Sequence, residues 1–474
     1  MAQASRGGEM DTLECKVVVI GGGPAGYTAA IRCGQLGAPV VLVDEGGLGG
    51  VCLREGCIPS KALIGATKAV SHVQELLSAG VVVGDVRIDP DRLAEFKDKV
   101  VSDLMNGLRD LMKANRVKVL EGRGEIAGLG RVVAHTAGGV VECRTEAVIV
   151  ATGSVPITLP VLPVDGVRVW SSSHALSIPE VPPSLAMVGA GYVGLELATV
   201  YARLGSRVTV IEVKGQVLPG IDRDLAQVVA TRLRRLGVEV LTDAAVLSAD
   251  TKGDDIVLQV DRHGKALEVR CSKVLLAVGR RPSLSGLGLE TIGLEAASFF
   301  DVDDRMQTRV PWVFAAGDVT GPPLLAHKAH MEGEVAAEAA CGHRKSLRAR
   351  VVPAVAFTDP EVAVVGLSEA QAAEKGVEYI KGRFPLAALG RAHADSAQYG
   401  LVKVLADPKT HELLGVGMAG AGAGEVIAEA TLAVEKRLPL EDIEAVIHSH
   451  PTYAEAFQEA CRAALGRAIH VVNR

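Results

Sequence analysis

The sequence predicts an α/β protein in which two similar βαβ units precede an α+β domain. Apolar strands alternate with helical stretches through most of the chain, one spacing of glycines occurs twice, and near Arg348 this pattern gives way to another order of strands and helices. Because the 474 residues, 48% of them hydrophobic, exceed what one core usually organises, we expect several domains.

The first βαβ unit runs from Val17 to Asp44 as an apolar strand, a glycine-rich turn, a helix and a second strand. Gly21 would permit the tight turn, Gly23 would let a pyrophosphate approach the backbone, and Gly26 would let the helix pack on the strand. Asp44 would accept hydrogen bonds from ribose hydroxyls. This predicts a Rossmann-like dinucleotide site; the alternative is a merely tight turn.

Cys52 and Cys57 follow that unit directly. Residues five apart in a regular helix are about 140° out of line, whereas a disulfide needs Cα atoms roughly 4.4 to 6.8 Å apart, so we expect a distortion at Gly56. A helix starting near Pro59 would stabilise a thiolate at Cys57. The placement suggests a redox disulfide beside a bound dinucleotide. Two reduced core thiols or a structural staple are the alternatives.

The second βαβ unit runs from Ala186 to Glu212, with glycines at Gly189, Gly191 and Gly194. Each glycine and the terminal acid follow their counterparts in the first unit by the same 168 residues, which predicts two separate dinucleotide sites. Glu212 would accept a hydrogen bond from a free ribose 2′-hydroxyl and repel a 2′-phosphate, which favours NAD over NADP. The alternative is that one site is degenerate and empty.

The stretches outside the two βαβ units indicate how the chain is divided into domains. Residues 60–120 look mostly helical and 117–150 strand-rich, and a proline-bearing crossing follows residue 155. Thr152, Gly153, Gly279 and Asp318 stand where strands run into loops, the places where open α/β sheets hold ligands. The predicted segments are the first part of the first nucleotide domain with the cysteine pair (1–155), the second nucleotide domain (156–278), the second part of the first (279–349) and the α+β domain (350–474).

The chain closes with the segment His-Ser-His450-Pro-Thr452-Tyr-Ala-Glu455. From the spacing alone, the plainest interpretation is a capping box, in which Thr452 caps a helix and Glu455 reaches back to its amide. His450 would then be an ordinary loop histidine before a proline.

Composition excludes several classes of protein. With a net charge of −6 and only 3% aromatic residues, nothing suggests a nucleic-acid surface. No apolar run is long enough to predict a membrane span, and the N-terminus resembles no secretory signal. Eight cysteines are too few for a disulfide scaffold, which favours a reducing compartment, with the cytoplasm as the default.

Eight segments together resemble the flavin-dependent pyridine nucleotide disulfide oxidoreductases, in that family's order and over nearly the whole chain. Within the family, the chain is most similar to members that oxidise dihydrolipoamide as the third component of 2-oxo acid dehydrogenase complexes. The segments are GGGPAGYTAAI, GGVCLREGCIPSKAL, ATGS, GAGYVGLELA, VGRRP, AAGDVTGPPLLAHKAHMEG, FTDPEVAVVGLSEAQA and HSHPTYAEAFQEA.

The resemblance implies FAD on the first unit, with Asp318 reaching its ribitol chain, and NAD on the second. It implies that residues 350–474 form the interface of a homodimer, and that lipoyl domains and an acyltransferase core are partners. In relatives, the histidine matching His450 enters the partner subunit's active site, held by the glutamate matching Glu455. No metal is implied.

The resemblance also gives roles to two further groups of residues. The substrate thiolate would attack Cys52, and Cys57 would be the sulfur nearest the flavin. Lys61 and Glu196 match an ion pair near the flavin; the alternative is a surface lysine and an ordinary helix glutamate.

Three residues depart from the family's pattern. Val51 stands for a threonine, Arg54 for an asparagine and Tyr453 for a smaller aliphatic residue. The first change removes a hydroxyl near the flavin, and the bulk of Tyr453 would narrow the thiol channel. Three alternatives stay open: a glutathione- or mercuric-reductase-like enzyme, a soluble transhydrogenase, and a mainly structural subunit with an idle redox centre.

Overall fold

The computed structural model describes residues 11–76, 79–84, 86–295 and 298–473. It divides the chain into two compact units, each assembled from three separate stretches of sequence. The first unit comprises Met1–Pro59, Asp98–Val155 and Arg280–Arg348. The second comprises Ser60–Lys97, Pro156–Gly279 and Ala349–Arg474.

The first unit is built on an eight-stranded sheet in the order β1-β6-β5-β4-β3-β2-β7-β18. Its central strands are parallel, and β2 and β7 are buried along their whole length, as expected of a sheet covered on both faces. The strands are β1 (Asp11–Glu14), β2 (Val17–Ile20), β3 (Val40–Asp44), β4 (Lys118–Gly128), β5 (Arg131–Thr136), β6 (Gly139–Arg144), β7 (Ala147–Val150) and β18 (Val313–Ala315).

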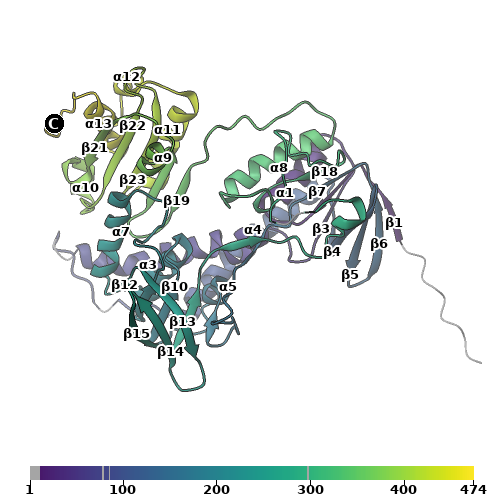
Figure 1. Ribbon diagram of the computed structural model, residues 1–474, viewed down its shortest axis with the longest axis horizontal. Helices are drawn as coiled ribbons and strands as arrows, with labels where there is room; N and C mark the ends of the chain where they lie inside the picture. Colours follow the sequence, from purple (N-terminus) through teal and green to yellow (C-terminus); the bar gives the residue numbers. More distant parts are fainter. Residues whose placement is uncertain (1–10, 77–78, 85, 296–297, 474) are drawn as a thin grey trace, which may run out of the picture. The chain divides into compact units, whose positions relative to one another are not determined.

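Helices α1 (Pro24–Gln35) and α8 (Ala326–Ala340) lie side by side in this unit, beside β7 and β18 in Figure 1. Their close approach depends on Gly333, because a Cβ there would lie 2.2 Å from the carbonyl oxygen of Ala25. The other helices that enter the unit are α2 (Gly50–Glu55), α3 (Cys57–Leu76), α4 (Pro90–Ala114), η2 (Leu289–Ile292) and η3 (Asp318–Thr320). Short strands β8 (Ser154–Pro156) and β17 (Arg280–Pro282) pair with each other.

The second unit contains a parallel five-stranded sheet in the order β12-β11-β10-β16-β9, the second dinucleotide-binding sheet. Its strands are β9 (Val169–Trp170), β10 (Ser184–Val188), β11 (Arg207–Ile211), β12 (Glu239–Leu241) and β16 (Lys273–Leu276). An antiparallel sheet accompanies it, formed by β13 (Ala244–Asp250), β14 (Ile256–Arg262) and β15 (Lys265–Cys271). The helices are α5 (Ser172–Leu176), α6 (Tyr192–Arg203) and α7 (Arg223–Arg235).

The same unit contains the predicted α+β domain, built on an antiparallel sheet in the order β19-β20-β23-β22-β21. Helix α13 packs on this sheet at Gly382, where a Cβ would lie 2.0 Å from the carbonyl oxygen of Ala460. The strands are β19 (Ala354–Ala356), β20 (Val362–Gly366), β21 (Ile380–Pro385), β22 (Leu401–Ala406) and β23 (Leu413–Ala419). The helices are α9 (Glu369–Glu374), η4 (Leu386–Ala388), α10 (Gly390–Ala394), α11 (Ala423–Lys436), α12 (Leu440–Ala445) and α13 (Glu455–Ala464).

The predicted fold class is confirmed: a mixed sheet with parallel central strands, a second sheet that is wholly parallel, and a C-terminal α+β domain are present. Among the described residues, no helix combines the length and the apolar character that crossing a membrane requires.

Candidate active site

Cys52 and Cys57 are joined as a disulfide, with their Cα atoms 4.7 Å apart. Helix α2 ends at Glu55 and α3 begins at Cys57, so the helical path breaks at Gly56, whose φ and ψ are −147° and −105°. A Cβ at this glycine would lie 2.9 Å from the carbonyl oxygen of Val51. The expected distortion is therefore present, and it is what brings the two cysteines within bonding range.

Helix α3 begins two residues earlier than predicted, at Cys57 itself. The unpaired amide groups of a helix N-terminus favour negative charge, so a thiolate at Cys57 is stabilised by about 0.3 to 1 kcal/mol. At two other cysteines, burial instead favours the protonated thiol: it raises the pKa of both Cys15 and Cys271 to about 11. These thiols stay protonated at neutral pH and are poor nucleophiles.

The first dinucleotide unit shows why its glycines are spaced as they are. Gly21 has φ of +105°, and a Cβ there would lie 2.3 Å from the carbonyl oxygen of Ala151. A Cβ at Gly26 would lie 1.8 Å from the carbonyl oxygen of Gly21, so a side chain would separate the helix from the strand. Around Gly23, by contrast, the nearest atom to such a Cβ is 3.9 Å away. The second glycine therefore opens onto space at the N-terminus of α1, where a phosphate fits.

Asp44 is the acid that closes this unit. Its Oδ1 accepts a hydrogen bond of 2.8 Å from the amide of Gly22, while Oδ2 is buried with no hydrogen-bond partner among the residues that the structure describes. Burial raises the pKa of Asp44 above its ordinary value, against the opposing effect of the Gly22 amide. A buried oxygen without a donor is costly, and a ribose hydroxyl would supply that donor. The residues therefore fit a dinucleotide.

The second dinucleotide unit repeats this geometry closely. Gly189 has φ of +106°, and a Cβ there would lie 2.4 Å from the carbonyl oxygen of Ala277. A Cβ at Gly194 would lie 2.2 Å from the carbonyl oxygen of Gly189. A Cβ at Gly191 would have no atom within 4 Å in the described part of the chain, apart from its immediate chain neighbours. The equal spacing found in the sequence is thus an equal backbone geometry, again with an open second glycine for a phosphate.

Glu212 closes the second unit with both oxygens engaged. Oε2 accepts 2.7 Å from the amide of Ala190, and Oε1 accepts 2.8 Å from the amide of Lys214. The residue is buried. Because each carboxylate oxygen has two lone pairs, a ribose hydroxyl can still donate to it.

Asp318 lies in a chain of hydrogen bonds within the first unit. Its Oδ2 accepts 2.5 Å from the hydroxyl of Ser154, and Ser154 Oγ accepts 2.7 Å from Nε of Arg280. Thr152 turns away, donating 2.6 Å to the carbonyl of Ser283, and Gly153 has φ of +69°. Neither Ser154 nor Arg280 was predicted from the sequence as a site residue. Ser154 ends the ATGS motif, and Arg280 lies in VGRRP.

Glu332 was also missed. It lies buried on α8 and accepts 2.8 Å from the amide of Gly317 and 3.0 Å from the hydroxyl of Thr320. Lys328, one turn earlier on the same helix, lies 2.8 Å away and balances the charge. Glu332 therefore fixes the loop that carries Asp318. The i, i+4 spacing of Lys328 and Glu332 was the signal available in the sequence.

Lys61 and Glu196 form an ion pair in the second unit. Lys61 Nζ lies 2.9 Å from Oε2 of Glu196, and the hydroxyl of Ser60 donates 2.7 Å to the same oxygen. The amide of Phe357 donates 3.0 Å to Oε1, and Lys61 Nζ lies 4.5 Å from the Phe357 ring centre. Glu196 is 3% exposed. Neither residue is an ordinary surface group, because α3, α6 and the segment after β19 meet at this carboxylate.

His450, in the segment between α12 and α13, pairs with Glu455 at the start of α13. Nδ1 lies 2.8 Å from Oε1 of Glu455, and the imidazole side chain is 76% exposed. The neighbouring His448 is different, because its Nε2 is bonded to Glu429 at 2.9 Å and its side chain is only 5% exposed. Of the two, His450 is the one presented to solvent, with one nitrogen oriented by a carboxylate.

The capping-box interpretation of this segment is half wrong. The N-cap of α13 is Ala454, and the hydroxyl of Thr452 donates to the carbonyl of Ser449 instead of capping the helix. Glu455 does reach back to the amide of Thr452, at 2.8 Å, through Oε2. One oxygen of this carboxylate therefore fixes the backbone and the other orients His450.

The structure shows where two of the residues that depart from the family's pattern, Val51 and Arg54, lie. Val51 lies on α2 and is 41% exposed. A Cβ at Gly47 would meet the guanidinium of Arg54 at 2.8 Å, and the charge of Arg54 acts to lower the pKa of Asp44. Arg54 is thus close enough to influence the first dinucleotide site.

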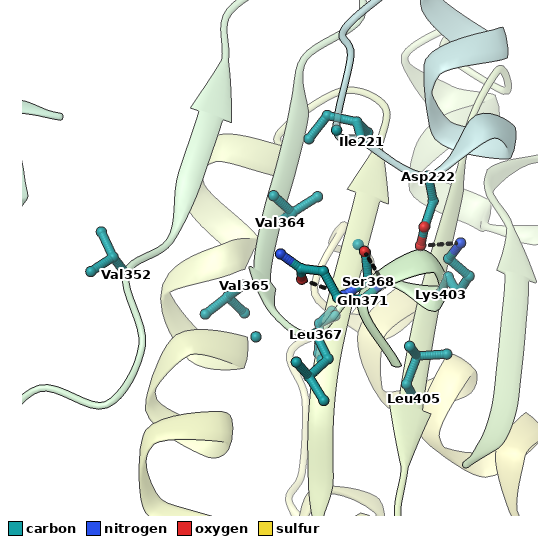
Figure 2. Close-up of a pocket in the computed structure, with 15 residues that line it drawn as sticks. Ile221, Asp222, Val352, Val364, Val365, Leu367, Ser368, Gln371, Lys403 and Leu405 are labelled. Carbon is teal, nitrogen blue, oxygen red and sulfur yellow. Dashed lines mark hydrogen bonds and ion pairs between the residues drawn. The ribbon is translucent and has the colours of Figure 1, made fainter. Parts of the chain in front are cut away.

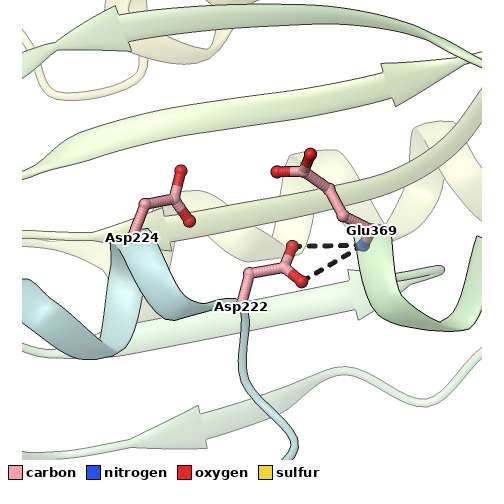
Figure 3. Close-up of side chains that lie close together, drawn as sticks. All are labelled: Asp222, Asp224 and Glu369. Atoms are coloured by element: carbon pink, nitrogen blue, oxygen red, sulfur yellow. Dashed lines mark hydrogen bonds between the residues drawn. The ribbon is translucent and has the colours of Figure 1, made fainter.

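Three carboxylates on the second unit, Asp222, Asp224 and Glu369, lie close enough together to hold a cation (Figure 3). The ammonium of Lys403 already fills that role, at 2.7, 2.9 and 2.7 Å from the three in turn. Lys403 is 2% exposed and lines a neighbouring pocket with Val364 (Figure 2). The cluster therefore joins α7, α9 and β22 through a buried lysine.

Lys403→Met is expected to destabilise the protein by about 3 to 5 kcal/mol, because three partly buried carboxylates lose the buried ammonium that they share. Burial opposes ionisation of Glu369, but hydrogen bonds from Lys403 and Lys381 lower its pKa to about 2, below the ordinary 4.5. That stabilisation is complete above pH 4.5 and is lost as pH falls towards 2. Denaturant unfolding at several pH values measures both effects; an unchanged midpoint at pH 7 would contradict the assignment.

Two family models match the chain. The pyridine nucleotide-disulphide oxidoreductase model covers residues 15–333. The dimerisation-domain model of the same family covers residues 352–461.

Curated relatives match over almost the whole chain. The chain is 39% identical to a dihydrolipoyl dehydrogenase of Geobacillus stearothermophilus, covering 98% of each sequence. It is 43% identical to dihydrolipoyl dehydrogenase 2 of Haloarcula marismortui, covering 97% of this chain and 98% of the relative.

Two solved structures match the fold over nearly the whole chain. LpdA from Mycobacterium tuberculosis matches with a TM-score of 0.87 at 29% identity, covering 94% of this chain and 99% of LpdA. A flavoprotein disulfide reductase of Escherichia coli, RclA, solved as a Cu(II) complex, matches with a TM-score of 0.85 at 27% identity, covering 95% and 99%.

Proposed function

The chain belongs to the pyridine nucleotide-disulphide oxidoreductases, and from this premise we propose that it is a dihydrolipoyl dehydrogenase, which oxidises protein-bound dihydrolipoamide and reduces NAD. The observation that carries the proposal is the Cys52–Cys57 disulfide at the start of α3, in a chain with two complete dinucleotide units. A disulfide is the oxidant that a dithiol substrate requires.

His450 begins the reaction as a general base. Its Nδ1 faces Glu455, so Nε2 is the nitrogen left to take a proton from a substrate thiol. Glu455 stabilises the imidazolium that forms and keeps the ring in one orientation. Only the resulting thiolate attacks a disulfide sulfur.

The disulfide then takes the electrons. The substrate thiolate attacks Sγ of Cys52, the bond between Cys52 and Cys57 breaks, and Cys57 leaves as a thiolate favoured by the N-terminus of α3. The second substrate thiol, deprotonated, attacks the mixed disulfide. The products are lipoamide, oxidised by two electrons, and a reduced cysteine pair.

FAD and NAD are the cofactors of the family. When bound, FAD would supply the two-electron chemistry that links the cysteine pair to NAD. Gly21, Gly23 and Gly26 would hold the FAD pyrophosphate, and Asp44 its ribose. Asp318 would bond the ribitol, with Thr152 and Gly153 beside it.

The second unit would hold NAD in the corresponding way, with the pyrophosphate at Gly189, Gly191 and Gly194 and the ribose at Glu212. Gly279, with φ of +120°, would lie at the edge of this site. The ion pair of Lys61 with the buried Glu196 would lie near the flavin.

The functional form in this proposal is a homodimer, because His450 would complete the partner subunit's site. The dimerisation-domain match supports it. So do exposed apolar side chains in this domain, among them Ile447, 98% exposed and three residues before His450. In the cytoplasm, the dimer would serve a 2-oxo acid dehydrogenase complex, receiving electrons from lipoyl domains and docking on the acyltransferase core.

A substrate panel tests the function. Purified protein with its own flavin is given dihydrolipoamide with NAD or NADP, and NADH or NADPH with glutathione disulfide or mercuric ion. We expect efficient turnover only with dihydrolipoamide and NAD. Turnover of glutathione disulfide with NADPH, or of mercuric ion, would assign the chain to another branch of the family.

Gly191→Ala is expected to raise the KM for NAD about tenfold, the effect of roughly 1.4 kcal/mol of lost binding, while FAD content and thermal stability stay normal. The added methyl has space in the protein but occupies the place of the pyrophosphate. Steady-state kinetics against NAD measure the effect. Gly194→Ala is the contrasting variant, because its methyl would collide with the backbone and lower stability as well. An unchanged KM would mean that NAD binds elsewhere.

A further inference from the structure

The segment that carries His450, residues 446–454, contains no helix or strand and leaves the imidazole exposed. Most of its side-chain bonds are local: Thr452 bonds Ser449, and His450 bonds Glu455. A base acting on a substrate thiol must nevertheless be held to within a fraction of an ångström. His448, bonded to Glu429 of α11 at 2.9 Å, holds the part of the segment before His450. The part after His450 needs a connection of its own to the body of the domain.

Tyr453 makes such a connection. Its hydroxyl donates 3.0 Å to Oδ2 of Asp395, a residue 58 positions earlier that follows helix α10. Its ring packs into the core of the α+β domain and lies against Gly422 at the start of α11, where a Cβ would meet the ring at 3.3 Å. The side chain thus links the catalytic segment to two helices.

Asp395 is itself held in place. Nε of Arg391, one turn earlier, donates 2.7 Å to the same Oδ2, and this bond lowers the pKa of Asp395. Burial, with Asp395 beside it, raises the pKa of Tyr453 far above its usual range. At neutral pH the acid is charged and the phenol is protonated, so the bond between them is of the charge-assisted kind.

We propose that Tyr453 and Asp395 are positioning residues for His450, because their hydrogen bond fixes the segment that presents the imidazole to the thiol substrate. The inference rests on the proposed function and extends it to two residues that act through His450. It also gives the unusual tyrosine a role other than narrowing the thiol channel.

Tyr453→Phe separates positioning from packing, because phenylalanine keeps the ring in the core and loses only the hydroxyl. We expect kcat for dihydrolipoamide oxidation to fall about tenfold with little change in KM, the result when a transition-state interaction is weakened. Electron transfer from NADH to ferricyanide, which requires no thiol base, should keep its wild-type rate. If packing were the whole role of Tyr453, both activities would be unchanged.

Asp395→Asn is the second variant, and should reproduce the defect because the acceptor loses its charge. The double variant should be no slower than the slower single variant, since both remove one interaction. Tyr379→Phe is the matched control, because that hydroxyl also bonds a carboxylate of the same domain, Glu369 at 3.2 Å, and not the 446–454 segment. It should retain wild-type kinetics.

The outcomes are distinguishable. A wild-type protein that cannot oxidise dihydrolipoamide would overturn the proposed function, and this inference with it. A wild-type protein that turns over, with Tyr453→Phe and Asp395→Asn equally fast, would overturn the inference alone. If one variant fails to fold, the other still decides, because their expected defects are the same.

Discussion

Cys52→Ser and Cys57→Ser are each expected to reduce dihydrolipoamide oxidation to the background rate while FAD stays bound. The expectation follows from the chemistry, since a serine hydroxyl can neither form nor break a disulfide. Helix α3 and the glycine turn do not depend on the sulfur atoms, so the flavin site should survive. Turnover of dihydrolipoamide and the flavin absorbance of the purified protein measure the two effects separately.

Cys15→Ser is the matched control for these variants. Cys15 is a thiol of intermediate exposure in the same unit, with a weak bond of 3.6 Å to the carbonyl of Arg144. It should retain normal turnover. If Cys52→Ser or Cys57→Ser also retained turnover, the disulfide would be structural and the proposed mechanism would be wrong.

His450→Gln is expected to lower kcat/KM for dihydrolipoamide by about 10²-fold or more, the usual contribution of a general base. Glutamine can keep the hydrogen bond to Glu455 but cannot accept the thiol proton at neutral pH. Stopped-flow measurement of flavin reduction by dihydrolipoamide places the defect in the thiol half of the reaction. Reduction of the flavin by NADH should be unchanged.

His411→Gln controls for the loss of a histidine and carboxylate pair. Nδ1 of His411 lies 2.6 Å from Glu441 in the same domain, with similar chemistry and no proposed part in the reaction. Its kinetics should remain those of the wild type. If the His450→Gln variant were as fast as the His411→Gln control, His450 would not be the general base and would be an ordinary loop histidine.

The parts of the molecule that the sequence predicted are those set by local rules. The two glycine turns depend on backbone conformations that only glycine adopts easily, so Gly21 and Gly189 could be placed from spacing alone. The break at Gly56 followed from the number of residues between the cysteines. The start of α3 was misplaced by two residues, because the proline signal marks the first turn and not its first residue.

What the sequence did not predict depends on contacts between distant residues. Ser154 and Arg280 are 126 positions apart, and Lys403 meets Asp224 across 179. Motifs mark Ser154 and Arg280 singly, but nothing in the local sequence marks which residues pair. Thr452 was misassigned for a related reason: its spacing to Glu455 fits a capping box, but the helix begins at Glu455, so the hydroxyl is too far back to cap it.

The central claim is that electrons pass through the sulfur pair at the start of α3. Its most direct test is to map which cysteines react with iodoacetamide, first in the oxidised protein and then after one equivalent of dihydrolipoamide is added without NAD. The account predicts that Cys52 is unlabelled in the oxidised protein, becomes labelled after the dithiol is added, and that labelled protein no longer forms NADH. Label on Cys52 before reduction, or unimpaired NADH formation by the labelled protein, would contradict it.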